Sequence, residues 1–169
     1  MIKIKNSNYR SGCIVGKNKL IQFIRKLKKD KKIIGICDGS FDLLHPGHIT
    51  HLNSAKKVCD VLIVLVARDK MSKERKGTNR PLFSEKVRAF SVSQIKSVDF
   101  VVLNNNTFDV LKIVKPDYYI KGPDYKNKNE KDHKKVIKFM EGFGGKVVYT
   151  EDQKLSTSEI ITYIKKEVE

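Results

Sequence analysis

The chain has 169 residues, of which 40% are hydrophobic and 32% are charged, a size and composition typical of one globular domain. Its 35 Lys and Arg residues outnumber 19 Asp and Glu residues, giving a formal net charge of +16, so we expect an anionic partner such as nucleic acid, anionic lipid or a phosphorylated small molecule. No apolar run approaches the roughly 20 residues that span a bilayer, which argues against a membrane protein.

The cysteines and the first residues favour a reducing compartment. The sequence has an odd number of cysteines, Cys13, Cys37 and Cys59, and they lack CxxC spacing. This fits reduced thiols better than a disulfide framework. Residues 1–6 lack the apolar region and cleavage site of a secretory signal. We therefore expect a cytoplasmic protein.

Apolar periodicity divides the chain into an N-terminal extension, residues 1–30, and a domain, residues 31–169. The extension carries one amphipathic helix at 19–29. In the domain, short β-branched runs alternate with helical stretches, which is the pattern of βα units around a parallel sheet. We predict strands at 33–37, 61–66, 100–103, 118–121 and 146–150, and helices at 47–58, 84–96, 108–114, 130–143 and 156–167. The fold class is therefore α/β, a single domain with a five-stranded parallel sheet and helices on both faces.

One long interruption, residues 68–82 (RDKMSKERKGTNRPL), has no apolar periodicity and is rich in Lys and Arg. We predict a loop here, and a loop of this length inside a compact domain is usually functional. Its side chains would supply mobile positive charge to an anionic ligand. A solvated charged loop is the alternative.

The stretch GSFDLLHPGH, residues 39–48, follows the first predicted strand, and ligands of open parallel sheets bind beyond the carboxyl ends of the strands. Gly39 permits a tight turn and close approach to a ligand. Pro46 and Gly47 open a helix whose first N–H groups form an anion site.

Two histidines flank this helix start. His45 and His48 can donate hydrogen bonds to the same phosphate chain. A zinc site that adds His51 is one alternative, although the residues between the histidines break the helical spacing that such a site needs. Turn histidines satisfied by backbone groups are the other.

A second candidate anion site lies near the end of the chain. Ser156, Thr157 and Ser158 precede the last predicted helix, with Glu159 close behind. Their hydroxyls and the free N–H groups of the helix start can bind phosphate oxygens. A capped helix without a ligand explains the same residues.

Gly39, Ser40, Phe41 and Asp42, followed by HPGH at 45–48, resemble the G-x-F-D-x-x-H-x-G-H signature of the cytidylyltransferase-like nucleotidyltransferases, whose fold is Rossmann-like. Within that family the chain is similar to the adenylyltransferases that activate D-glycero-beta-D-manno-heptose 1-phosphate. The supporting stretches are KGTNRP at 76–81, VDFVV at 98–102, KPDYYIKGPDY at 115–125, GGKV at 144–147 and STSEII at 156–161.

The resemblance implies roles for individual residues. The catalytic residues would be His45, His48, Lys73 and Lys76, and which of the two lysines acts is left open. The nucleotide-binding residues would be Gly39, Ser40, Phe41, Asp42, Gly47, Arg88, Lys121, Gly122, Asp124, Ser156, Thr157 and Ser158. Arg80 would bind the substrate. Mg²⁺ is expected as the counterion of the nucleotide, held mainly by phosphate oxygens and water rather than by a protein metal site.

Two of these residues have structural alternatives. Asp42 is the nearest candidate ligand for Mg²⁺, but it can equally stabilise a turn. Asp124 follows the fourth predicted strand, where the fold would place the base, and can accept a hydrogen bond from a base amine or a ribose hydroxyl. A tight turn at the end of that strand explains Asp124 as well.

The reaction that the resemblance implies is the attack of a sugar phosphate oxygen on the α-phosphorus of a nucleoside triphosphate, with release of pyrophosphate. The expected substrates are ATP and heptose 1-phosphate, giving ADP-heptose, and a homodimer is possible because relatives are commonly dimers. The alternative is a cytidylyltransferase for glycerol 3-phosphate or another polyol or amino-alcohol phosphate.

Two departures bear on the substrates. TEDQKLSTS at 150–158 lacks the arginine that CDP-glycerol enzymes carry before their Ser-Thr motif, which weakens the glycerol alternative. Lys154 stands where heptose-type enzymes usually have Gly. An alternative of another class is a non-enzymatic nucleic-acid-binding protein, but RNP-type, zinc-finger and basic-heptad patterns are missing from the sequence, so we expect no nucleic-acid partner.

Overall fold

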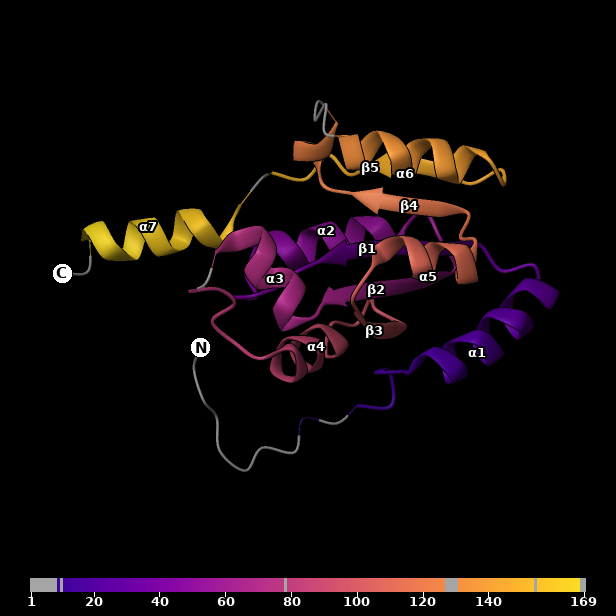
Figure 1. Cartoon of the computed structure of the whole chain (residues 1–169), viewed down its shortest axis with the longest axis horizontal. Coiled ribbons are helices and arrows are strands. Elements are labelled where there is room, and N and C mark those ends of the chain that lie inside the picture. The colour runs from indigo at the N-terminus through magenta and orange to yellow at the C-terminus, as the bar shows by residue number, and fades with distance from the viewer. Residues whose placement is uncertain (1–8, 10, 78, 127–130, 154, 168–169) are drawn as a thin grey trace.

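A computed structural model describes residue 9 and residues 11–77, 79–126, 131–153 and 155–167 (Figure 1). One parallel sheet has the strand order β3-β2-β1-β4-β5. Its strands are β1 (Ile34–Gly39), β2 (Val61–Ala67), β3 (Phe100–Asn104), β4 (Tyr118–Lys121) and β5 (Lys146–Tyr149). All five predicted strands are confirmed, with ends shifted by at most two residues.

Helices cover both faces of the sheet (Figure 1). On β2, Ile63 and Leu65 pack in one apolar cluster with α1 (Lys17–Lys29), α5 (Thr107–Val114) and α6 (Lys131–Glu141). The alternate residues Leu62, Val64 and Val66 pack in the other cluster with α2 (Pro46–Lys56) and α4 (Glu85–Ser93). Because successive side chains of a strand point to opposite faces, a strand that is buried along its whole length needs this double cover. The predicted α/β class is confirmed.

The N-terminal helix belongs to the same core. Leu20 is 1% exposed, and together with Ile24 it packs in the cluster of α5 and α6. Just before the helix, Ile14 forms an isolated parallel bridge to Val101 of β3. Residues 14–29 thus lie against the edge of the sheet and α5, while the domain boundary at residue 30 stays a prediction.

The predicted loop at 68–82 was wrong in its first half, because the structure has a helix, α3 (Asp69–Lys76). This helix buries only Ser72, so it has no apolar stripe for a periodicity search to find. Hydrogen bonds fix its start instead: Glu85 accepts from the N–H of Asp69 at 3.0 Å and from Arg68 at 2.5 Å.

Two of the remaining helices are followed by residues with positive φ. Lys115 closes α5 with a left-handed conformation (φ 43°) directly before Pro116. Gly144 (φ 84°) follows α6 and donates to the carbonyl of Glu141 at 3.1 Å. A short 3₁₀ helix, η1 (Pro123–Tyr125), follows β4.

The last helix, α7 (Thr157–Glu167), starts at the carboxyl edge of the sheet and then projects away from it (Figure 1). Thr157 at its start is buried, whereas Tyr163 further along is 65% exposed. Within the described ranges, no helix is both long enough and apolar enough to cross a bilayer.

Candidate active site

Helix α2 presents an N-terminus without a side-chain cap at the carboxyl edge of the sheet. His45 is its N-cap residue, with extended backbone (φ −140°, ψ 165°), and Pro46 occupies the first turn. Proline fits there because the first N–H groups of a helix have no partner inside the helix. These groups carry partial positive charge, so this end of α2 favours an anion.

The imidazoles of His45 and His48 stack at this helix start, with ring centroids 3.7 Å apart and an interplanar angle of 26°. Both ring nitrogens of His45 and Nδ1 of His48 are buried without a hydrogen-bond partner among the described residues. Burial, His45 and Lys76 lower the pKa of His48 to about 3. Burial and Lys76 also lower the pKa of His45. Both rings are therefore neutral at pH 7, and each can donate one N–H to an anionic oxygen.

Close packing explains two glycines of this stretch. Phe41 has a left-handed backbone (φ 47°), and its ring lies 5.2 Å from that of His48. A Cβ at Gly39 would lie 2.9 Å from the Phe41 ring, and a Cβ at Gly47 would lie 3.0 Å from Cβ of Leu155. The start of α2 thus approaches the segment before α7 so closely that a side chain at Gly47 would collide with it.

Asp42 organises the segment between α3 and α4. Its carboxylate is fully buried and accepts from Nε of Arg80 at 2.6 Å, from the N–H of Leu82 at 2.6 Å and from the N–H of Phe83 at 3.3 Å. These bonds match the turn-stabilising alternative for Asp42. They also hold Arg80 at the site, with its Nη2 buried and without a partner among the described residues.

Arg88 is buried in the protein interior, with 1% of its surface exposed. Its guanidinium donates to the carbonyl oxygens of Ser40, Ala67 (2.7 Å) and Phe83 (3.0 Å) and to Asp69 (2.8 Å). The structure therefore places Arg88 beneath the predicted site, where it ties the ends of β1 and β2 to α3.

The two lysines that the sequence could not separate lie on different sides of α3. The hydroxyl of Ser72 donates to that of Ser40 at 3.2 Å, so this side of α3 faces the loop after β1. Lys76 is four residues further and shares that side, whereas Lys73 is rotated by about 100° around the helix. Lys76 is exposed, but partial burial of its ammonium, together with the nearby Arg80, lowers its pKa.

A buried ion pair joins the carboxyl ends of β1 and β4, and sequence reasoning missed one partner. Lys121 was predicted at the site, but Asp38, which accepts its Nζ at 2.7 Å, was not. Asp38 also accepts from Tyr119 (2.6 Å) and Thr107 (3.0 Å). Burial would raise the pKa of Asp38, but Lys121, the hydrogen bond from Tyr119 and the charge of Arg75 hold it at about 2. The one signal for Asp38 in the sequence was an acidic residue near the end of an apolar strand.

The turn after β4 extends this cluster. Burial would lower the pKa of Lys121, but Asp38 and Tyr125 raise it, and the ammonium lies 3.8 Å from the centroid of the Tyr125 ring. Gly122 caps η1, and Asp124 in η1 is exposed, with Oδ1 2.9 Å from where a Cβ at Gly122 would lie. The predicted residues at 121–124 therefore lie together at the carboxyl end of β4.

The start of α7 is a reciprocal capping box. Glu159 accepts from the N–H of Ser156 at 2.8 Å, and Ser156 accepts from the N–H of Glu159 at 3.2 Å. Thr157 is buried and donates to the carbonyl of Leu43 at 3.4 Å. Ser158 is exposed. The capped helix is thus present, and its first residue contacts the loop that contains the histidines.

Further bonds join α2 to the segment between β5 and α7. Nδ1 of His51 and Oγ1 of Thr150 are 3.0 Å apart, and Ser54 donates to Asp152 at 2.8 Å. His51 therefore faces Thr150, not a metal site with His45 and His48. Among the residues that the structure describes, no group of three His, Cys, Asp or Glu side chains is placed to hold a metal ion.

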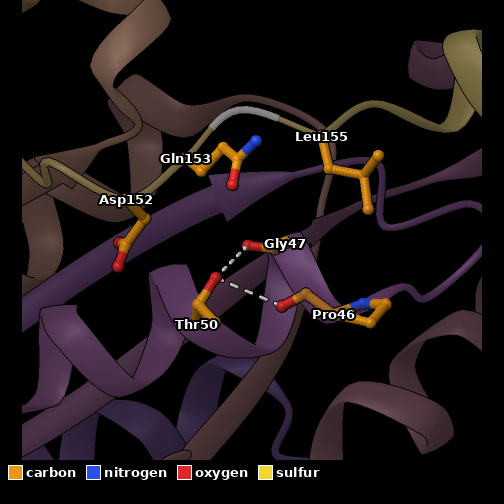
Figure 2. A pocket seen from close by; sticks show the side chains of 6 residues that line it. All are labelled: Pro46, Gly47, Thr50, Asp152, Gln153 and Leu155. Carbon is orange, nitrogen blue, oxygen red and sulfur yellow. Dashed lines mark hydrogen bonds between the residues drawn. The ribbon is translucent and has the colours of Figure 1, made fainter.

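A hollow of about 300 Å³ opens between α2 and this segment. Figure 2 shows Pro46, Gly47 and Thr50 on one side of it and Asp152, Gln153 and Leu155 on the other. The Thr50 hydroxyl lies 3.2 Å from the carbonyl oxygens of both Pro46 and Gly47. The first turn of α2 and the segment before α7 therefore line one shared hollow.

Comparison with known proteins agrees with this geometry. The chain is 34% identical to the bifunctional protein HldE of Helicobacter pylori over 87% of its length, and 37% identical to that of Campylobacter jejuni subsp. doylei over 90%. It spans about 31% of the length of these curated relatives. The crystal structure of the lipopolysaccharide core biosynthesis protein from Thermoplasma volcanium is 31% identical, with a TM-score of 0.62, and the match covers 73% of this chain and 99% of that one. The family model described as cytidylyltransferase-like matches residues 36–163. The chain therefore belongs to the cytidylyltransferase-like family.

Proposed function

We propose that this protein is a nucleotidyltransferase that joins ATP to heptose 1-phosphate, giving ADP-heptose and pyrophosphate. The observation that carries the proposal is the meeting of the starts of α2 and α7, where Thr157 bonds to Leu43 beside the unpartnered nitrogens of His45 and His48. The likeness to HldE proteins, together with the sequence resemblance to heptose 1-phosphate adenylyltransferases, supports this pair of substrates.

The triphosphate would bind between the two helix starts. His45, His48 and the first N–H groups of α2 would donate to phosphate oxygens, and Thr157 and Ser158 would do so from the start of α7. Neutral imidazoles suit this role, because each N–H that now lacks a partner would gain an anionic acceptor. The nucleoside would extend toward the turn after β4 and the hollow of Figure 2.

Magnesium would enter with the nucleotide. Of the carboxylates beside the site, Asp38 is paired with Lys121 and Asp42 with Arg80. Phosphate oxygens and water would therefore supply most ligands of the ion. Bound there, Mg²⁺ would neutralise charge that develops on the departing pyrophosphate.

The chemistry needs no covalent intermediate on the protein. A phosphate oxygen of the acceptor forms a bond to the α-phosphorus of ATP as the bond from that phosphorus to the bridging oxygen of pyrophosphate breaks, and pyrophosphate carries away the electron pair. The protein contributes positioning and positive charge. We assign the imidazole N–H groups and Lys76 to the triphosphate, because Lys76 faces the loop that holds the histidines.

A matrix of substrates tests the proposal. Pyrophosphate release would be measured for ATP, CTP, GTP and UTP, each with heptose 1-phosphate, glycerol 3-phosphate and no acceptor. We expect release with ATP and heptose 1-phosphate alone or far above every other pair. Release confined to CTP would contradict the proposed base and favour the cytidylyltransferase alternative.

The alternative of another class makes a different forecast. A non-enzymatic nucleic-acid-binding protein would bind oligonucleotides with a steep dependence on salt concentration, and it would release no pyrophosphate with any pair in the matrix. That combined result would contradict the proposed activity as a whole.

A further inference from the structure

Hydrogen bonds from one side of helix α3 fix it against the loop between β1 and α2, residues 40–45, called the active-site loop. Ser72 donates to Ser40 of that loop, and both side chains are buried. At the start of the helix, Asp69 accepts from the buried Arg88 at 2.8 Å. This side of α3, called the Ser72 face, therefore has a fixed orientation toward the carboxyl edge of the sheet.

Helical geometry places two cations on the Ser72 face. Residues three and four positions apart in an α-helix lie on one side, so Arg75 and Lys76 share the side of Ser72. Lys70, two residues before Ser72, is rotated by about 160° from it at about 100° per residue. Arg75 and Lys76 are both exposed and therefore accessible to a ligand.

Most other cations of this edge are already neutralised. Lys121 is paired with Asp38, Arg80 with Asp42 and Arg68 with Glu85. In the part of the chain that the structure describes, the side chains of Arg75 and Lys76 form no ion pair or hydrogen bond. The Ser72 face thus offers two adjacent, uncommitted positive charges.

Arg75 and Lys76 flank Ser72 on opposite sides, because at about 100° per residue they lie about 60° behind it and about 40° ahead of it around the helix. The two cations therefore face different parts of the site. Lys76 is close enough to His45 and His48 to lower the pKa of each. Arg75 instead acts on Asp38 near the end of β1, where it helps to lower the pKa of that carboxyl. Lys76 therefore adjoins the triphosphate position of the proposed function, and Arg75 lies beside it toward β1.

The proposed reaction brings two anions together. The acceptor phosphate must approach the α-phosphorus opposite the departing pyrophosphate, and it needs a cation that the triphosphate does not use. A guanidinium suits this task because it can bind two oxygens of one phosphate at once.

We propose that Arg75 binds the phosphate of the acceptor while Lys76 binds the triphosphate. This assignment rests on the proposed function. Arg75 would then select phosphorylated acceptors. The two substrates would be bound by neighbouring residues of α3, one by Arg75 and the other by Lys76.

Calorimetric titration tests the assignment on the full chain. Heptose 1-phosphate would be titrated into protein saturated with Mg²⁺ and a non-hydrolysable ATP analogue, and the analogue would be titrated separately. For Arg75→Ala we expect acceptor affinity to fall at least 10-fold and analogue affinity to change less than 2-fold. Arg75→Lys should recover part of the loss because it restores the charge without the two-pronged geometry. Lys70→Ala, which removes one charge from the opposite side of α3, should leave both affinities within 2-fold of wild type.

The outcomes separate the two proposals. Equal acceptor affinity in wild type and Arg75→Ala would overturn the assignment alone, as would an equal loss of acceptor and analogue affinity. A wild-type protein that binds the analogue but no sugar phosphate would overturn the proposed function and the assignment with it. Circular dichroism of each variant would confirm that it is folded, and Arg75→Lys carries the test if Arg75→Ala is not.

Discussion

His48 shows how a single side chain can be prepared for an anion. Burial, together with His45 and Lys76, holds its pKa at about 3, so the free protein carries a neutral imidazole there at pH 6. A triphosphate beside the ring favours the charged form and raises that pKa. We therefore expect ATP binding at pH 6 to take up protons, and uptake to vanish near pH 8, where the imidazole stays neutral in both states.

Calorimetry in two buffers of different ionisation enthalpy measures this uptake. His48→Ala should reduce it and lower turnover by about 100-fold, the usual effect of removing one preorganised donor. His48→Asn keeps an N–H donor without the titrating ring, so it should lose the uptake but retain more turnover than the alanine variant. Equal binding enthalpies in both buffers at pH 6 would mean that His48 stays neutral when the nucleotide binds, which would contradict the expected rise of its pKa.

Asp38 supplies a prediction about stability. Its folded pKa of about 2 lies below the ordinary value of 3.8, so the ionised carboxylate stabilises the folded protein above pH 4, and this contribution is lost as pH falls toward 2. We expect Asp38→Asn to lower the free energy of unfolding at pH 7 by about 2 kcal/mol, since one pKa unit corresponds to about 1.4 kcal/mol. Urea titrations at several pH values would show the gap between wild type and variant narrowing below pH 4. A gap that stays constant down to pH 2 would mean that the ion pair with Lys121 does not carry it.

Of the six residues that line the hollow, the sequence singled out Pro46 and Gly47, because proline and glycine at a helix start describe backbone geometry. It could not place Asp38 or Arg75. Whether Asp38 is paired depends on which strand lies beside β1, and whether Arg75 faces the loop depends on a helix that the sequence did not reveal. The sequence also did not predict that Arg88 is buried, because its burial results from the packing of β1, β2 and α3 around it.

At the scale of elements, strands were easier to predict than α3. β2 is buried along its whole length, so seven apolar residues in a row mark it unambiguously. α3 instead buries one serine, and its start is fixed by Glu85 from the next helix. Apolar spacing in the sequence therefore predicts a buried strand such as β2 but cannot predict a helix such as α3, which buries no apolar residue.

The N-terminal helix gives a prediction at this scale. Because Leu20 is almost completely buried against the sheet and α5, Leu20→Ala should lower the free energy of unfolding by about 2 to 5 kcal/mol. Lys19→Ala, on an exposed position of the same helix, should change it by less than about 0.5 kcal/mol. Denaturant titration measures both. A small effect at Leu20 would mean that α1 is an appendage of the domain and not part of its core.

At the scale of the whole molecule, the positively charged side chains fall into two groups, which have different expected roles. Many lysines lie on exposed helix positions, such as Lys26 and Lys29 of α1 and Lys134 and Lys135 of α6. At the carboxyl edge of the sheet, Arg75 and Lys76 carry positive charges without an ion-pair partner among the described residues, and Lys76 lies near the neutral His45 and His48. The net charge attracts anions over a long range, whereas the side chains at the carboxyl edge of the sheet would select which anion binds.

The bonds that join α2 and the loop before it to Thr150, Asp152 and Thr157 connect residues 98, 99 and 114 positions apart. A ribosome adds about 5 to 20 residues per second, so the histidine loop is made about ten seconds before the segment that completes it. During that interval the first half of the sheet can form, but the loop has no opposite wall. We therefore expect the nascent protein to gain affinity for nucleotide only after the start of α7 has been synthesised, and a chain that stops at residue 149 to lack it.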